Sequence, residues 1–267
     1  LKKYTIYVLV ILAMLVPMVK PIGIPVKVTA DTQKFYNAME EFQPGDVVLW
    51  DIHFQLSSAN ELTPQISAMA YHLVERGAKC IIVSLHPESY PFALEAVEEF
   101  KRLGKVYGTD MAYLGYLPGE EVAVASILAD LHQTVPEDYE GTPISSIPLL
   151  ANVKTGNDLT AVVSINTSGP EAWTRQLHAF PDVDLLYASI ANTKTTIQTY
   201  LSTGQIKASL DGARCTAEYE LMLERPGKAL GLQDASSITF LVFLLFVVCG
   251  NIVQYLKPAV DRKGDAK

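Results

Sequence analysis

Basic clusters and paired cysteines are scarce in this sequence of 267 residues. It holds 21 lysines and arginines against 29 aspartates and glutamates, which gives a formal net charge of −8. Proteins that bind nucleic acids usually present a basic face, and here Lys and Arg gather only at the extreme C-terminus, so no nucleic-acid partner is expected. The three cysteines form neither a CxxC pair nor a zinc-type spacing. No cofactor is identified from the sequence.

Motifs that would mark an enzyme are missing as well. The sequence has no G-x-G-x-x-G or Walker loop for a nucleotide and no H-x-x-E-H spacing for a catalytic metal. Internal repeats and low-complexity tracts are absent. The residues therefore favour a protein that is not an enzyme, although they do not exclude one.

The first of two long apolar segments is Tyr4–Val19, which is short for a membrane span unless the apolar residues after it extend it. A signal peptide is the alternative, because Val28–Ala30 resembles a small-residue cleavage site. Lys20 and Lys27 interrupt the region where cleavage would be prepared. We therefore predict an uncleaved membrane anchor over residues 1–26.

The second apolar segment, Ile238–Leu256, is long enough to cross a bilayer. We predict a transmembrane helix over residues 236–257 and a basic tail over 258–267. With two spans, both tails must lie on the same side of the cell membrane, and lysines at the N-terminus match the basic tail. The positive-inside rule then places both tails in the cytoplasm and the domain between them, residues 27–230, outside it.

Strands alternate with helices between the two anchors. Val47–Trp50 is a short apolar run after a turn, which is typical of a strand covered on both faces. A helical pattern then runs to Gly77, and the apolar run Lys79–Leu85 completes a βαβ unit. Further strands are predicted over 105–117, 160–165, 184–190 and 206–210, with a short helix over Ile147–Val153. About six strands in this alternation predict an α/β fold with a doubly wound, mostly parallel, Rossmann-like sheet, flanked by N- and C-terminal transmembrane helices.

Polar residues follow the strands at the edge where open parallel sheets bind ligands. The candidates for ligand binding are Asp51, His53, His86, Glu88, Asn166, Thr167, Ser168, Gly169 and Lys194. An aspartate, a glutamate and two histidines can together bind a divalent ion, and N–H groups of the Asn166–Gly169 turn can hold an anion. The alternative, which we favour, is that these residues end strands and cap helices, and no metal site is assigned.

The second apolar segment carries small and polar residues that a plain anchor does not need, namely Gly250, Asn251 and Gln254. A side-chain amide without a partner in hydrocarbon is costly, so such residues usually face another helix. We therefore predict that this helix packs against a copy of itself or against another membrane protein. An alternative of equal weight is that headgroups or water satisfy the two amides near the membrane surface.

Several stretches carry a resemblance to a known group of proteins. They are Gly104–Glu121, Gly141–Pro143 with Ile147–Leu150, and Ser202–Gln205 followed by Asp211–Glu220. Through them the chain resembles, over nearly its whole length, an uncharacterised family of bacterial proteins with a membrane span at each end. The resemblance implies the same membrane-anchored α/β layout and brings no established activity, cofactor or catalytic residue. Arg214–Thr216 departs from the small residues expected there.

A second resemblance is to membrane-bound serine proteases of the ClpP/crotonase type. In those enzymes a strand like Val47–Ile52 and a helix precede a strand like Arg76–Leu85, and Ser126 would be the nucleophile. Their glycine-rich oxyanion stretch is missing here. We predict instead a non-catalytic subunit or scaffold of a membrane-associated assembly, as a homo- or hetero-oligomer. A membrane-anchored ligand-binding or sensing domain is the first alternative, and a hydrolase or peptidase is the second.

Overall fold

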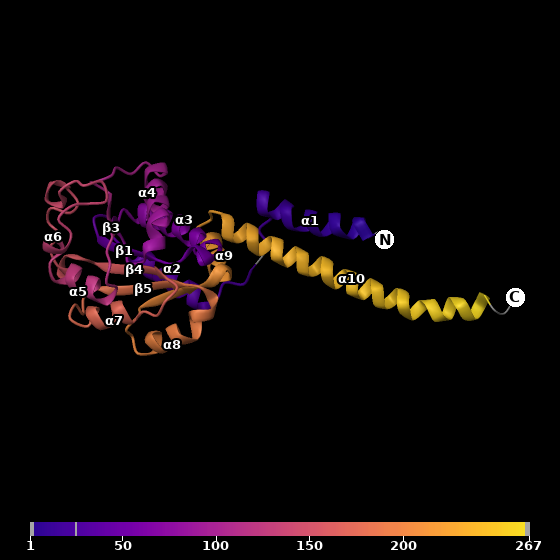
Figure 1. Ribbon diagram of the computed structural model, residues 1–267. Helices are drawn as coiled ribbons and strands as arrows, with labels where there is room; N and C mark the ends of the chain where they lie inside the picture. Colours follow the sequence, from indigo (N-terminus) through magenta and orange to yellow (C-terminus); the bar gives the residue numbers. More distant parts are fainter. Residues whose placement is uncertain (1–2, 25, 265–267) are drawn as a thin grey trace. The chain divides into compact units, whose positions relative to one another are not determined.

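The computed structural model describes residues 3–24 and 26–264 of the chain (Figure 1). The chain divides into two compact units. One unit is the continuous segment Val26–Ala229, and the other combines Leu1–Pro25 with Leu230–Lys267. Each unit has its own organisation and is described separately.

The first unit is built on one sheet of six parallel strands, which confirms the predicted α/β fold. The strands are β1 (Val47–His53), β2 (Lys79–Ser84), β3 (Met111–Tyr116), β4 (Ala161–Asn166), β5 (Asp184–Ser189) and β6 (Ala208–Asp211). They are paired in the order β3-β2-β1-β4-β5-β6, with every neighbouring pair parallel. This is the doubly wound Rossmann order, in which the direction of winding reverses between β1 and β4.

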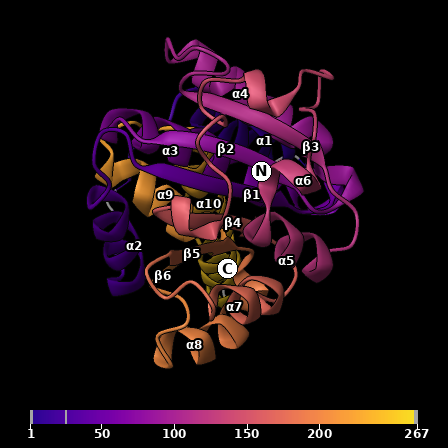
Figure 2. The same cartoon turned by 90° about the vertical axis from the view of Figure 1, so that its left-hand side faces the viewer.

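Helices cover both faces of this sheet (Figure 2). One layer holds α2 (Ala30–Glu40), α3 (Ala59–Arg76), α4 (Tyr90–Arg102) and α9 (Gly212–Met222). The other holds α5 (Glu121–Ala129), α6 (Leu131–Thr134), α7 (Glu171–Leu177) and α8 (Lys194–Ser202). Short 3-10 turns lie at Leu56–Ser58, Pro87–Ser89, Ile144–Ser146, Gly156–Asp158 and Ala191–Thr193.

The apolar run that begins β1 packs against the helix layers on both faces of the sheet. Val48 and Trp50 pack toward α3 and α4, whereas Leu49 packs toward the layer of α5 and α7. Successive side chains of a strand point to opposite faces, so a strand with helices on both sides needs an unbroken apolar run. The same alternation sends Asp51 and His53 toward the layer that contains α7.

The helix predicted over Ile147–Val153 is wrong, because this segment consists of turns that follow a 3-10 turn. The N–H of Leu149 donates to the carbonyl of Gly108, 2.9 Å away, and is not available for a helical bond. Pro148 supplies no N–H at all. Most apolar residues of the segment are buried in the core, so its hydrophobic pattern reflects burial and not helical periodicity.

The second unit contains α1 (Lys3–Val19) and all but the first two residues of α10 (Lys228–Gly264). Within the part of the chain that the structure describes, one helix is long and apolar enough to cross a membrane, over Lys228–Ile252. Its start lies well before the predicted boundary at residue 236. At 1.5 Å per residue, 25 residues extend for about 37 Å, which covers the hydrocarbon core and much of the headgroup layers.

The predicted N-terminal span is not established by the structure. The apolar helix there runs only over Ile6–Val19, and all of α1 would extend for about 25 Å against a core of about 30 Å. The apolar residues expected to lengthen it are not helical over 20–24, where Pro21 and Gly23 stand. Pro25, Lys2 and residues 265–267 of the predicted basic tail lie outside the described residues.

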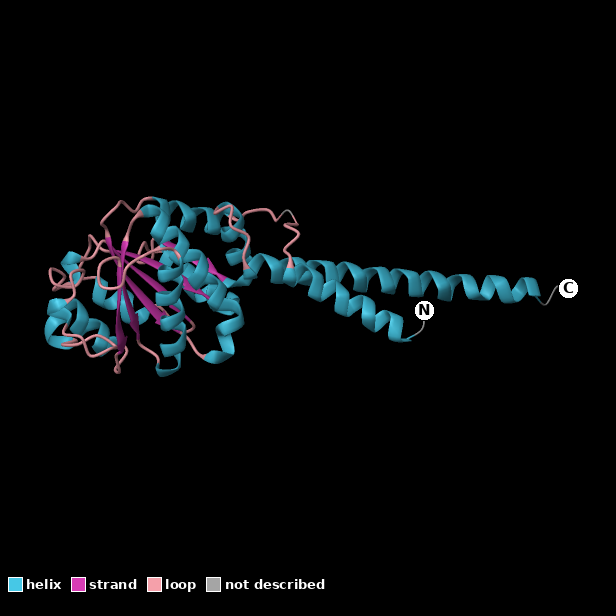
Figure 3. Ribbon diagram, turned by 90° about the horizontal axis from the view of Figure 1, so that it is seen from above, coloured by secondary structure: helices cyan, strands magenta, loops and turns pink. Residues whose placement is uncertain are grey.

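The carboxylate of Asp234 joins α10 to the segment that follows α1. It accepts the backbone N–H groups of Ile22, Gly23 and Ile24 at 2.7, 2.8 and 3.0 Å, and its side chain is fully buried. A Cβ atom on Gly231 would lie 3.2 Å from the carbonyl oxygen of Pro17, so α1 approaches α10 closely at this point. Figure 3 shows α1 beside the first half of α10.

Candidate functional site

The candidate site lies where β1 and β4 end side by side. His53 and Asn166 are register partners at the ends of these strands, at the point where the winding reverses. Asp51 lies one step deeper and is fully buried. Its Oδ2 accepts the hydroxyl of Ser164 and the indole N–H of Trp173, both at 2.7 Å. Burial raises the pKa of Asp51, against the opposing effects of His53 and of these two donors.

Three of the predicted site residues come together here. The rings of His53 and His86 lie 5.8 Å apart between centroids, and proximity to His53 opposes the rise that burial causes in the pKa of Asp51. Two buried atoms, Asp51 Oδ1 and His53 Nε2, have no hydrogen-bond partner among the described residues. Asp51 and His53 lie two residues apart on β1, so the alternation of the strand places both on the same face of the sheet.

The four residues considered as ligands of a divalent ion are not grouped to hold one. In the described part of the chain, no group of three or more His, Cys, Asp and Glu side chains is arranged to hold a metal ion. Glu88 accepts the N–H of Leu56 at 3.0 Å, and His86 Nδ1 accepts the N–H of Glu88 at 3.2 Å. These polar groups bond to the chain's own backbone.

The turn Asn166–Gly169 does not present an open cradle for an anion. Asn166 Oδ1 accepts the N–H of Ser168 at 2.6 Å, and the N–H of Thr167 donates to the carbonyl of His53 at 3.2 Å. A Cβ atom on Gly169 would overlap the carboxylate of Glu171, so a negative group already lies against the turn. The cation expected beside it is engaged elsewhere, because Lys194 pairs with Asp31 at 2.9 Å.

A carboxylate that the sequence analysis did not single out, Glu61, bonds to the backbone of two further segments that follow strands at this edge. Glu61 Oε1 accepts the N–H of Ala191 at 2.9 Å and the N–H of Ala213 at 3.3 Å. These residues follow β5 and β6, and Glu88 plays the same part for Leu56 after β1. Backbone N–H groups at strand ends are the donors that bind phosphate in nucleotide-binding sheets. Here acidic side chains of the chain itself already accept from them.

The other predicted residues belong to α5 and α10. Ser126 donates its hydroxyl to the carbonyl of Val122 in its own helix, 2.9 Å away, and no base contacts it among the described residues. Asn251 is exposed on α10, and its Nδ2 donates to the carbonyl of Val247 at 2.9 Å. Gly250 and Gln254 are likewise exposed, and a Cβ atom on Gly250 would meet nothing within 4 Å.

The fold and this edge define a Rossmann-like α/β domain whose chain also carries a long apolar helix. No family model and no curated protein matches the sequence. Among solved structures, the crystal structure of a mutant of O-ureido-L-serine synthase with bound O-ureido-L-serine is 16% identical. The match covers 79% of this chain and 73% of that one, with a TM-score of 0.24, and carries no argument about function.

Proposed function

We propose that this protein is a membrane-anchored, non-catalytic subunit or scaffold of an assembly of membrane proteins. The observation that carries the proposal is the apolar stretch Lys228–Ile252 of α10, whose 18-residue apolar window is only 6% buried within the chain. Exposed side chains along it include Phe240, Phe243 and Val248. A continuous apolar surface of this length is stable only in a bilayer or against other proteins.

One observation supports the proposal that the protein is not an enzyme. Acidic side chains already accept from the backbone N–H groups that an anionic substrate would use. Glu61 and Glu88 hold the N–H groups of the strand-end loops, and Glu171 lies against the turn after β4. A phosphate or carboxylate ligand would have to displace these side chains and would meet their negative charge. A domain with this edge is better suited to holding other proteins in place than to binding an anionic substrate.

Substitution of the polar residues of α10 tests whether this helix binds other membrane proteins. Asn251 Nδ2 is satisfied within its own helix, which leaves its Oδ1 and the amide of Gln254 for a partner helix. An interhelical hydrogen bond contributes on the order of 0.6–2 kcal/mol. Changing Asn251→Leu together with Gln254→Leu should therefore lower the apparent mass of the complex extracted in mild detergent, measured by native mass spectrometry.

Val248→Leu is the control for this experiment, since it changes an exposed side chain of the same helix without removing a hydrogen-bonding group. It should leave the mass of the complex unchanged. An unchanged mass in the double variant would show that α10 is a plain anchor. Proteins that co-purify with the wild-type chain and are lost from the double variant would be the partners.

We further propose that both tails lie in the cytoplasm and that the α/β domain lies outside it. The support is the contact of Asp234 of α10 with the segment after α1 and the basic residues toward the two chain termini. A membrane-impermeant thiol reagent should then fail to label Lys267→Cys on intact cells. The experiment uses a Cys249→Ala background, because Cys249 is exposed; Cys80 and Cys215 are buried, and burial raises the pKa of the Cys80 thiol. Labelling equal to that of permeabilised cells would reverse the topology.

A second candidate function, a ligand-binding or sensing domain, is favoured by the partnerless atoms Asp51 Oδ1 and His53 Nε2. If they bind a small ligand, divalent ions or phosphate should raise the melting temperature of residues 26–229. A ligand at 100 times its dissociation constant stabilises by about 2.7 kcal/mol. His53→Ala should abolish the shift, and His178→Ala, at an exposed position, should retain it. Equal melting temperatures with every ion would remove this function.

A further inference from the structure

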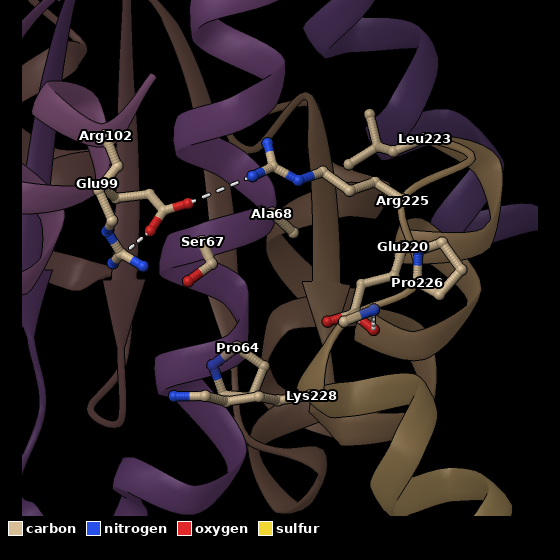
Figure 4. A pocket seen from close by; sticks show the side chains of 11 residues that line it. Pro64, Ser67, Ala68, Glu99, Arg102, Glu220, Leu223, Arg225, Pro226 and Lys228 are labelled. Atoms are coloured by element: carbon tan, nitrogen blue, oxygen red, sulfur yellow. Dashed lines mark hydrogen bonds and ion pairs between the residues drawn. The ribbon is translucent and has the colours of Figure 1, made fainter. Parts of the chain in front are cut away.

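A pocket in the α/β unit lies beside the residues that lead into α10 (Figure 4). Its volume is about 180 Å³, and its walls come from α3, from the end of α4 and from the segment after α9. The polar residues that line it are Ser67, Glu99, Arg102, Glu220, Arg225 and Lys228. Three cations, one from the end of α4 and two from the segment after α9, therefore surround a space large enough for a phosphate group.

A buried carboxylate orients two of these cations. Glu99 is only 4% exposed, and its two oxygens pair with Arg102 and, at 3.7 Å, with Arg225. The guanidinium of Arg225 also lies 4.3 Å from the centre of the Tyr71 ring. Figure 4 shows the side chains of Arg102 and Arg225 reaching Glu99 from opposite sides. One negative charge shared by two fixed guanidinium groups leaves a local excess of positive charge.

The remaining two charged residues, Glu220 and Lys228, balance each other and leave that excess unchanged. The carboxylate of Glu220 accepts the N–H of Gly227 at 3.0 Å and the N–H of Ala229 at 3.1 Å, so the start of α10 already engages it. Lys228 is exposed and forms no ion pair with any described residue. The pocket thus counts three cations against two carboxylates, in a protein whose net charge is −8.

We infer that this pocket binds the phosphate of an anionic phospholipid headgroup. The inference rests on the proposed anchoring by α10, because Lys228 is the first residue of the stretch Lys228–Ile252 and would lie at headgroup depth. Guanidinium groups bind phosphate through paired, charge-assisted hydrogen bonds, and their prior orientation by Glu99 reduces the entropic cost of binding. A headgroup bound there fixes the domain against one leaflet.

The test uses the full chain in nanodiscs made of equal parts of phosphatidylcholine and phosphatidylglycerol. After mild detergent extraction, native mass spectrometry should show phosphatidylglycerol retained on the protein in preference to phosphatidylcholine. Arg225→Gln with Lys228→Gln should lower that retention, by roughly fivefold for each cation removed. The control, Lys105→Gln with Lys154→Gln, makes the same charge change outside the pocket and should retain the lipid. Unchanged melting temperatures would show that both variants fold.

The outcomes separate this inference from the anchoring on which it rests. If the chain enters nanodiscs but retains both lipids equally, the headgroup site is wrong and the anchor stands. If the chain does not enter nanodiscs, the proposed function itself fails. Inorganic phosphate and glycerol 3-phosphate are added in a separate experiment, to distinguish a free phosphate ligand from a lipid headgroup. If they raise the melting temperature of the wild type alone while no lipid is selected, the site takes a free phosphate and the lipid assignment is overturned.

Discussion

Replacing Glu218 by alanine should destabilise the α/β unit by about 3 kcal/mol or more. Glu218 is fully buried in α9, and its Oε2 accepts the N–H and the hydroxyl of Thr29 and the hydroxyl of Thr32, each at 2.8 Å. Its Oε1 accepts from Arg214 at 3.1 Å. Breaking a buried charged network leaves its donors unsatisfied, which typically costs about 3–5 kcal/mol. Urea unfolding of residues 26–229 measures the loss.

The effect of Glu218 should depend on pH in a defined direction. Burial alone would raise the pKa of Glu218, but hydrogen bonds from Thr29, Thr32 and Arg214 outweigh it and lower the pKa. The stabilisation is therefore complete above the unfolded pKa of about 4.3 and is lost as pH falls through the folded pKa. The difference between wild type and variant should shrink in strong acid.

The control for Glu218 is Glu98→Ala, which removes an exposed carboxylate paired with Lys101. Exposed pairs contribute about 0–1 kcal/mol, so this variant should unfold close to wild type. Equal unfolding midpoints for the Glu98 and Glu218 variants would contradict the role given to the buried network.

Replacing Asp234 by alanine should expose the backbone N–H groups of residues 22–24 to solvent. The three N–H groups of Ile22, Gly23 and Ile24 lose their common acceptor. A hydrogen bond to a charged group contributes about 1.5–3 kcal/mol, so exchange of these amides with solvent should accelerate by about ten- to a hundredfold. Hydrogen exchange of the full chain in detergent, followed by mass spectrometry, measures the rates.

Gln233→Ala is the matched control for Asp234, because it changes the adjacent residue of the same helix and accepts none of these bonds. Its exchange over residues 22–24 should equal that of the wild type. If Asp234→Ala also leaves the rates unchanged, the carboxylate does not hold the two helices together, and the support for a paired insertion of α1 and α10 is lost.

The α/β core was predictable because its signals are local. The run Val47–Trp50 is apolar on both faces, and polar residues follow it directly. Each later strand has the same form, and alternation with helices leaves few topologies other than a doubly wound sheet. The closeness of Asp51, His53 and His86 follows from strand-end positions, since β1 and β2 are neighbours.

The long-range hydrogen bonds between carboxylates and backbone N–H groups were not predictable from the sequence. Glu61 accepts from Ala191, 130 residues away, and Asp234 accepts from Ile22, 212 residues away. With 29 acidic residues in the chain, no local pattern distinguishes these from solvated ones. The expected anion site at Asn166–Gly169 illustrates the consequence, since only the fold places the Glu171 carboxylate against it.

Extraction of native membranes with alkaline carbonate tests the membrane anchor most directly. Anchoring by α10 predicts that the full chain stays in the membrane pellet, because the apolar stretch Lys228–Ile252 cannot leave the bilayer without exposing its surface to water. The variant with Asn251→Leu and Gln254→Leu should stay there too, since it loses partner contacts and gains apolar surface. Recovery of the wild-type chain in the supernatant, together with soluble proteins, would contradict the anchor and the function proposed from it.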